Sequence, residues 1–301
     1  MALSDVILAA PFVSRLVWRS SLPGTMIMAA AAGAYAGSAI RDWLSRHGVR
    51  PVNFRETFGI DVLAPAEMTE EQRCEEIALL TSTLNRIYTA PRGGRRAKAE
   101  MVDLALTDYI AGITGQLVET STEVRSFMLP QLLFPFALGA CDILSGDIAI
   151  FREVGIFEHH VLAHEFSHRK GYFREVEAQL LAYLALSSSE IPALVQSGLA
   201  ERLYRQMSLV SGRDRARLAH TIQTSDLRRE LKEEFSLRTP APSLYERLVS
   251  PAMEHLYEQR MRLTGQNGLS DYDEGFTNAL AAIDRRARRL AEAPVQSWRF
   301  K

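Results

Sequence analysis

The chain has 301 residues, of which 47% are hydrophobic and 24% are charged, a composition that is ordinary for a protein with a packed core. Its formal net charge is −1, so no global electrostatic field attracts nucleic acid or an acidic substrate, and we expect no nucleic-acid partner. The two cysteines, Cys74 and Cys141, stand in no CxxC or CxH spacing, and we interpret both as buried thiols.

The first 50 residues are predicted to form an N-terminal membrane-associated segment. Residues 22–40 carry no charge and are about as long as a helix that crosses a bilayer. They are rich in Ala and Gly, so the predicted span is marginal, and a buried Ala-rich helix of a soluble core is the alternative. Gly33 and Gly37 form a GxxxG pair, which would let a helix of a membrane-protein partner approach closely.

The residues around the candidate span indicate how it would sit in a membrane. Residues 1–18 hold Asp5, Pro11 and Arg15 among apolar side chains, so this stretch is predicted to lie in the lipid interface. More arginines follow the span than precede it, which predicts a main domain on the cytoplasmic side. Residues 51–66, with two prolines and a glycine, then form an irregular connector.

Two helices are predicted after the connector. Thr69 and Gln72 have the spacing of a capping box, and apolar residues recur at helical intervals up to Ile87. Residues 91–94, Pro-Arg-Gly-Gly, end that pattern, and a second helix is predicted from about residue 96 to residue 118. We interpret the second as a structural helix of the core.

Residues 123–151 differ from their surroundings because they hold prolines, glycines and short β-prone runs. The runs at 131–136 and 147–151 predict a small sheet. After residue 157 the sequence is helix-like again, nearly to the C-terminus. The predicted fold class is therefore α+β, mostly α-helical, with a small β-sheet that directly precedes the helix described next.

The stretch from His164 to His168 reads HExxH. Residues four apart on a helix project from one face, so both imidazoles can reach a single tetrahedral zinc ion. Glu165 lies beside the first ligand and can reach a zinc-bound water instead of the metal. This arrangement is typical of zinc peptidases, and it predicts a zincin-like metallopeptidase domain over residues 67–301 with Zn²⁺ as its cofactor.

A third protein ligand is needed, and geometry favours Glu175 over Glu177. On an uninterrupted helix Glu175 would lie about 10 Å further along the axis than His168, too far to bind the same ion. We therefore expect the first helix to end at Gly171 and a second helix to cover residues 173–186, with Glu177 on the far side. Both Nε2 atoms and a Glu175 oxygen should then converge within about 3–4 Å.

The other histidines are predicted to have no ligand role. His160 shares the face of the ligands, but three histidines in a row along one helix cannot bind one zinc ion, so we interpret it as a packing or supporting residue. His159 is expected at the surface. His47, His220 and His255 are isolated, and a solvated or core position is favoured for each.

These residues resemble an uncharacterised bacterial family of membrane-anchored candidate zinc peptidases, the domain of unknown function 3810. That family has HExxH, a short Gly-containing link, R-E-x-E-A-N and an apolar run, and the corresponding residues here are 164–168, 171, 174–179 and 181–185. The segment from Glu175 is also similar to the third-ligand motif of CAAX prenyl protease and HtpX-type membrane zinc peptidases, in which the first Glu binds metal. Residues 267–272 look like a further segment of the family.

The resemblance implies a gluzincin-like zinc metalloendopeptidase, located at the bacterial inner membrane, and covers most of the chain after the connector. The sequence departs from the family at Gln179, where Asn or Asp is usual, and residues 150–153 replace a Gly-Glu-Ala-Asn segment. The N-terminal membrane part is also shorter than the several spans of the family.

The implied reaction is hydrolysis of peptide bonds in a protein or peptide substrate. Glu165 would take a proton from zinc-bound water as the water attacks the carbonyl, and hand it to the leaving amine. Tyr272 and His255 are candidates for the donor that stabilises the oxyanion, although a structural role is favoured for each. Residues 147–151 would offer a strand edge to an extended substrate.

Two other classes of function fit the same motif. In the first, the chain is a catalytically inactive, zinc-peptidase-like scaffold subunit of a membrane complex, and the intact Glu165 argues against this. In the second, the site is a closed structural zinc site, but three protein ligands beside a glutamate fit an open site better.

Overall fold

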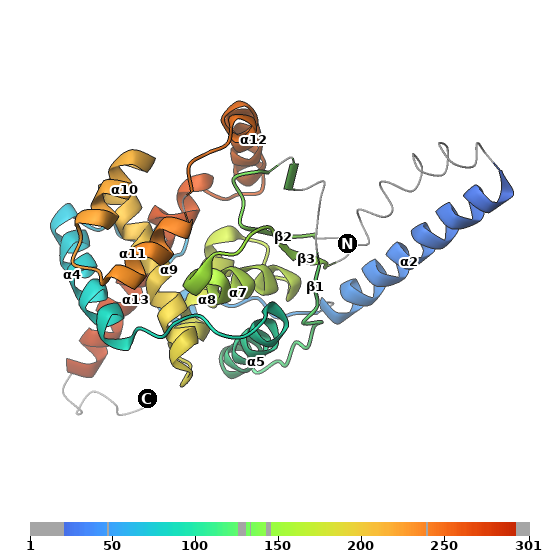
Figure 1. Cartoon of the computed structure of the whole chain (residues 1–301). Coiled ribbons are helices and arrows are strands. Elements are labelled where there is room, and N and C mark those ends of the chain that lie inside the picture. The colour runs from blue at the N-terminus through green and yellow to red at the C-terminus, as the bar shows by residue number, and fades with distance from the viewer. Residues whose placement is uncertain are drawn as a thin grey trace, which may run out of the picture.

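The structure is mostly helical with one small sheet, which confirms the predicted α+β class (Figure 1). This computed structural model describes residues 21–46, 48–125, 131–132, 134–142, 146–238 and 240–292. The helices before the sheet are α2 (Leu22–Arg46), α3 (Phe54–Thr57), α4 (Glu70–Ile87) and α5 (Arg95–Thr114). Those after the sheet are η1 (Gly155–Phe157), α7 (Glu158–Arg169), α8 (Glu175–Ser187), α9 (Pro192–Val210), α10 (Arg215–Thr224), α11 (Arg229–Arg238), α12 (Leu244–Leu263), η2 (Leu269–Tyr272) and α13 (Glu274–Glu292).

The two predicted helices α4 and α5 form where the sequence signals place them. Thr69 caps α4 with a reciprocal capping box. The Thr69 side chain accepts from the Gln72 N–H, and the Gln72 side chain accepts from the Thr69 N–H. Helix α5 ends at Thr114, before the predicted end at residue 118, because Gly115 takes a left-handed conformation with a φ of 68°. Both helices contribute buried apolar side chains to the main core.

The sheet has three short strands, β1 (Val124–Arg125), β2 (Gly139–Cys141) and β3 (Ile148–Ile150), in the order β1-β3-β2. Strand β3 pairs in parallel with β1 and antiparallel with β2, so β3 is central and β2 lies at an edge of the described strands. The predicted run at 147–151 is confirmed as β3. The run at 131–136 is wrong as a strand, because Gln131 and Leu132 are helical and Pro135, which has no N–H to donate to a sheet, lies in a turn.

Helix α7 lies at the centre of the fold and packs against α5, α8, α9 and the strands β2 and β3 (Figure 1). Every residue from Glu158 to Arg169 is buried. The buried carboxylate of Glu158 is paired with two cations. Its Oε2 lies 2.6 Å from Lys98 Nζ, and its Oε1 lies 2.7 Å from Arg95 Nε. The helix that carries the HExxH motif is therefore fixed by contacts on all of its sides.

The connector at residues 51–66 is irregular, as predicted, apart from the single turn of α3. It is not a free linker. Val52, Phe54, Ile60 and Val62 are buried and join the main hydrophobic core. The connector therefore packs on the body of the protein and is part of it.

Helix α2 projects away from the other helices (Figure 1). The predicted membrane span at residues 22–40 is not supported, since no helix of the described part of the chain is both long and apolar enough to cross a bilayer. The helix has the length, but Ala, Gly, Ser and Thr residues lower its hydrophobicity. Side chains added at Gly33 and Gly37 would meet nothing within 4 Å in the described structure. The predicted interfacial stretch, residues 1–18, lies outside the described residues.

Candidate metal centre

Helices α7 and α8 form an antiparallel pair joined by a short turn, and we call residues 158–187 the ligand hairpin. The turn at Gly171 is confirmed, because α7 ends at Arg169 and Gly171 has a φ of 104°, which favours glycine. The Tyr172 N–H donates to the Ser167 carbonyl at 3.1 Å and closes the turn. Helix α8 then begins at Glu175, two residues later than predicted, so the side chain of its first residue returns to the face of α7.

The turn brings the three predicted ligands together. Nε2 of His164 and Nε2 of His168 are 3.2 Å apart, and Oε2 of Glu175 lies 3.2 Å and 3.1 Å from them. All three residues are buried. Among the described His, Cys, Asp and Glu residues, these three form the group whose donor atoms lie close enough together to hold a metal ion. Glu177, the rival ligand, instead pairs with Arg174 at 3.3 Å.

The donor set could hold a metal ion, and its spacing can be compared with that of a zinc site. Zinc bonds of about 2.0–2.2 Å in a tetrahedron place neighbouring donors about 3.3 Å apart. The observed separations of 3.1–3.2 Å fit that spacing. Two imidazoles and one carboxylate leave a fourth position open. The arrangement therefore fits a divalent ion of the zinc type, and its occupation by zinc stays a prediction.

The hydrogen bonds around the histidines orient one ligand fully. His168 Nδ1 donates to the Tyr172 carbonyl at 2.8 Å, which turns Nε2 towards the other ligands. His164 Nδ1 is buried and has no hydrogen-bond partner in the described part of the chain. The same is true of Gln179 Oε1, at the position where the resembled family has Asn or Asp.

The short contacts among the three candidate ligands and their burial shift the pKa values of their side chains. Burial alone would raise the pKa of Glu175, but the two imidazoles outweigh burial and hold that pKa well below its usual value. Burial would lower the pKa of His168, but the Glu175 carboxylate outweighs burial and raises it to about 9. Burial lowers the pKa of His164. A cation that binds all three side chains would displace the proton of His168, so metal binding should release protons.

Glu165 lies next to the ligands without joining them. It is buried beside β2, where a Cβ added to Gly139 would lie 2.9 Å from Glu165 Oε1. A side chain at residue 139 would therefore displace the Glu165 carboxylate or the neighbouring strand. Burial raises the pKa of Glu165 to about 8.

The site opens into a cavity of about 850 Å³. One part of its wall is apolar and includes Phe134, Leu138 and Val161. Another part of the wall comes from α12, η2 and the turn between them, residues 244–272, which we call the C-terminal cover. A volume of this size accommodates several residues of a peptide.

Two tyrosines of the C-terminal cover reach the metal ligands. The Tyr257 hydroxyl donates to Glu175 Oε1 at 2.5 Å, and the hydroxyls of Tyr257 and Tyr272 are 3.2 Å apart. The Tyr272 ring also lies against the His164 ring, with centroids 5.9 Å apart. Tyr272, one of the predicted oxyanion candidates, is thus at the site, whereas sequence reasoning missed Tyr257 because no motif surrounds it.

The match to a known family covers this region. Residues 158–277 match the family model described as protein of unknown function, DUF3810. The match begins at the first residue of α7 and contains the three candidate ligands, Glu165 and the C-terminal cover. It is shorter than the resemblance predicted, because it omits α4, α5 and the sheet. No curated protein and no solved structure matches the chain.

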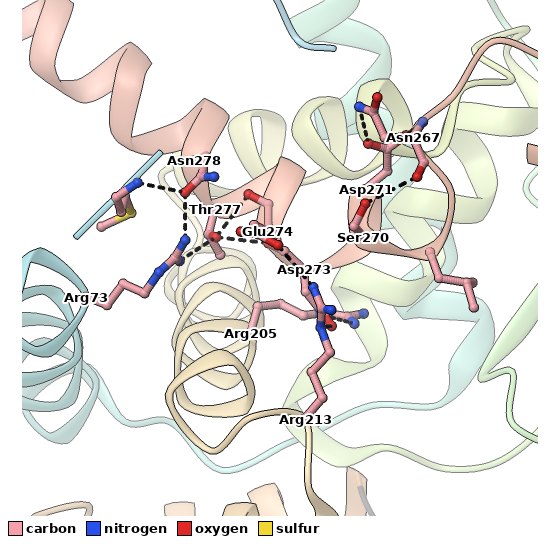
Figure 2. Close-up of polar contacts among 12 residues, drawn as sticks. Arg73, Arg205, Arg213, Asn267, Ser270, Asp271, Asp273, Glu274, Thr277 and Asn278 are labelled. Carbon is pink, nitrogen blue, oxygen red and sulfur yellow. Dashed lines mark hydrogen bonds and ion pairs between the residues drawn. The ribbon is translucent and has the colours of Figure 1, made fainter. Parts of the chain in front are cut away.

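Arginine side chains hold the C-terminal end of the DUF3810 match in place (Figure 2). Asp273, directly after η2, accepts from Arg205 at 2.6 Å and lies 3.5 Å from Arg213. Arg73 of α4 donates to Thr277 at 3.1 Å and to Asn278 at 2.8 Å in the first turns of α13. These contacts fix the position of Tyr272, the residue before Asp273.

A second charge cluster extends the same network and forms part of the cavity wall. Glu201 Oε1 of α9 accepts from Arg205 Nε at 2.7 Å and from Arg238 Nη2 at 2.6 Å. The Arg238 guanidinium also lies over the rings of Phe157 and Tyr204. The DUF3810 match therefore holds its helices together with paired charges as well as with apolar packing.

The remaining sequence predictions have mixed outcomes. His160 is buried, as a packing residue should be, but the surface prediction for His159 is wrong, because all faces of α7 are covered. His255 is exposed, bonds to Gln259 and is absent from the cavity wall, so its candidacy as oxyanion donor is wrong. His220 is exposed, and His47 lies outside the described residues.

The two cysteines also differ from the prediction of buried thiols. Cys74 is exposed, because it lies on the outer face of α4. Cys141 is half-buried at the end of β2, where it forms part of the cavity wall.

Proposed function

We propose that this protein is a zinc-dependent peptidase that hydrolyses peptide bonds. The observation that carries the proposal is the convergence of His164, His168 and Glu175 at 3.1–3.2 Å in a buried site that opens into a large cavity. Glu165, the residue that an HExxH peptidase uses as general base, lies in the wall of the same cavity. A purely structural metal site would need neither that glutamate nor the cavity.

The residues of the chain divide the reaction among them. His164, His168 and Glu175 would hold the ion, which when bound supplies a Lewis acid and lowers the pKa of water. The Glu165 carboxylate takes a proton from the attacking water and passes it to the leaving amine. The Tyr272 hydroxyl, a neutral donor because burial raises its pKa, donates to the developing oxyanion.

An extended substrate would lie along β2. The predicted substrate strand, residues 147–151, is the central strand of the sheet, so its edges are already paired. Strands β1 and β2 both lie at edges of the described sheet, but it is β2 that borders the cavity, because residues 138–142 form part of the cavity wall. A peptide that pairs with β2 would run past Glu165, whose carboxylate touches the space beside Gly139.

The scaffold reading is the second candidate function, and exposed apolar side chains favour it. Leu244, Leu248 and Leu263 of α12 are 74%, 72% and 88% exposed, which suits a surface that binds another protein. A scaffold would have no use for Glu165, however, so we rank peptidase activity first.

Replacement of Glu165 by Gln tests the proposal. The protein is purified without chelator, its metal content is measured by elemental analysis, and cleavage of casein and of a peptide library is assayed. We expect about one zinc ion per chain in both forms, and cleavage by Glu165→Gln about 10²–10⁴-fold slower than by the wild type.

Glu177→Gln is the matched control, because Glu177 lies two residues from Glu175 but pairs with Arg174 outside the ligand cluster. This control should keep both its zinc and its activity. Zinc without cleavage in the wild type would favour the scaffold, and a folded wild type without zinc would exclude the proposed metal chemistry.

A further inference from the structure

The two oxygens of Glu175 have different partners. Oε2 faces Nε2 of both histidines, at 3.2 Å and 3.1 Å. Oε1 accepts a hydrogen bond from the Tyr257 hydroxyl at 2.5 Å. A bond from a hydroxyl to a carboxylate is short and roughly twice as strong as one between neutral groups. The carboxylate is therefore held in one rotation, with one oxygen presented to the metal position and the other turned away.

The same part of the chain holds Glu175 a second time. The Glu175 N–H donates to Gln266 Oε1 at 2.8 Å. Tyr257 fixes the side chain of Glu175, and Gln266 fixes its backbone. Both residues belong to the C-terminal cover. Glu175 is thus fixed by two residues that follow it by 82 and 91 residues in the chain.

We infer that Tyr257 is a positioning residue that fixes Glu175 as a one-oxygen metal ligand and thereby sets the affinity of the site for zinc. The inference rests on the metal site of the proposed function, but it concerns binding and does not need peptide cleavage. Hydrogen-bonded partners of metal ligands typically change metal affinity by about 10–100-fold when they are removed.

The position of Tyr257 explains how one hydroxyl can have that effect. The residue is half-buried, and its ring forms a T-shaped contact with the Phe134 ring, with centroids 6.1 Å apart, which restricts its movement. Its hydroxyl is also 3.2 Å from that of Tyr272, which gives it a second polar neighbour. Without the hydroxyl, Glu175 could rotate and present both oxygens or neither to the ion.

Tyr257→Phe tests the inference, because it removes the hydroxyl and keeps the ring. Zinc affinity is measured by competition with a chromophoric chelator, and the visible absorption of the Co²⁺-substituted protein reports ligand geometry. We expect zinc affinity about 10–100-fold lower than in the wild type, together with a changed Co²⁺ spectrum.

Tyr245→Phe is the matched control. Tyr245 lies on the same helix and its hydroxyl also donates a hydrogen bond, to the Leu132 carbonyl, away from Glu175. This variant should bind zinc as the wild type does, and circular dichroism should show that both variants are folded.

The outcomes separate this inference from the proposed function. Weaker zinc binding by Tyr257→Phe alone supports the inference even if no form cleaves a peptide, a result that would count against the peptidase and leave the positioning role in place. Equal affinity and an unchanged Co²⁺ spectrum in Tyr257→Phe would overturn the inference while the peptidase could still stand. A wild type that binds no zinc would overturn both.

Discussion

The ligand hairpin and the C-terminal cover contribute to one site but differ in how they are held. All residues of α7 are buried, and α8 is buried along most of its length. In α12, by contrast, Ser250 and Met261 are the buried residues among those described, and several leucines face outward. The candidate metal ligands thus lie on tightly packed helices, whereas the hydroxyl that bonds to Glu175 lies on a weakly packed one.

This difference indicates which part of the site is free to move. Regions with few buried apolar contacts open more readily than the core. The ligand positions of His164 and His168 should persist whenever the protein is folded, whereas the contact of Tyr257 depends on the C-terminal cover. A movement of α12 would therefore widen the cavity without disturbing the ligand hairpin.

Phe166→Ala should have the largest effect on stability. Phe166 is fully buried in α7 between the two histidine ligands, and removal of a buried phenylalanine side chain costs about 3–5 kcal/mol. Leu248→Ala in α12 is the control, and because Leu248 is 72% exposed its cost should stay within about 0.5 kcal/mol. Urea unfolding of both variants measures the difference. Similar losses in the two would show that the cover is as tightly packed as the hairpin.

A pH dependence of intermediate size should come from Glu201, which joins α9 to α11 and, through Arg205, to η2. Burial alone would raise the pKa of Glu201, but Arg238 and Arg205 outweigh burial and lower it to about 2, from a usual value of 4.5. A carboxyl whose pKa is lower in the folded state stabilises the fold above pH 4.5, and this contribution disappears as the pH falls towards 2. The shift corresponds to about 3 kcal/mol.

Urea unfolding of the wild type and of Glu201→Gln between pH 7 and pH 2 checks that sign. The glutamine variant should be the less stable at pH 7, because it leaves buried arginines without their charge partner. The two stabilities should converge as the pH approaches 2. Curves that stay parallel over this range would show that Glu201 is not held ionised by the arginines.

Ser243→Ala should have the smallest effect and the most local one. Ser243 caps α12 by accepting from the Glu246 N–H at 3.1 Å, and loss of such a cap costs about 1 kcal/mol. We expect faster amide hydrogen exchange in α12 and little change in global unfolding. Thr69→Ala, which removes the capping box of the well-packed α4, should instead lower the global stability. Equal global losses would contradict the contrast between cover and core.

The ligand set could be predicted because its geometry is local. A spacing of four on a helix aligns His164 with His168, and Gly171 permits the turn that returns Glu175. The contribution of Tyr257 could not be predicted, since its contact with Glu175 is made across 82 residues and depends on how α12 packs. Tertiary contacts of this kind leave no periodic signal in a sequence.

Burial was predicted less well than secondary structure, for a physical reason. His159 stands among polar residues in the sequence, and such a run usually faces water. Here the polar residues of α7 are covered on every side because partners such as Lys98 and Arg95 neutralise Glu158 inside the protein. The capping box of α4, the strand β3 and the turn at Gly171 depended on neighbouring residues alone, and these predictions are confirmed.

The short turn between α7 and α8 also places two ligands at helix ends whose dipoles stabilise them. His168 lies in the last turn of α7, at the negative end of that dipole, and Glu175 is the first residue of α8, at the positive end of the other. Each ligand therefore has the type of charge that its helix end favours. Exchanging the two, with a carboxylate at 168 and an imidazole at 175, would keep the same donors but set both against their helix ends, at a cost of about 0.3–1 kcal/mol for each end.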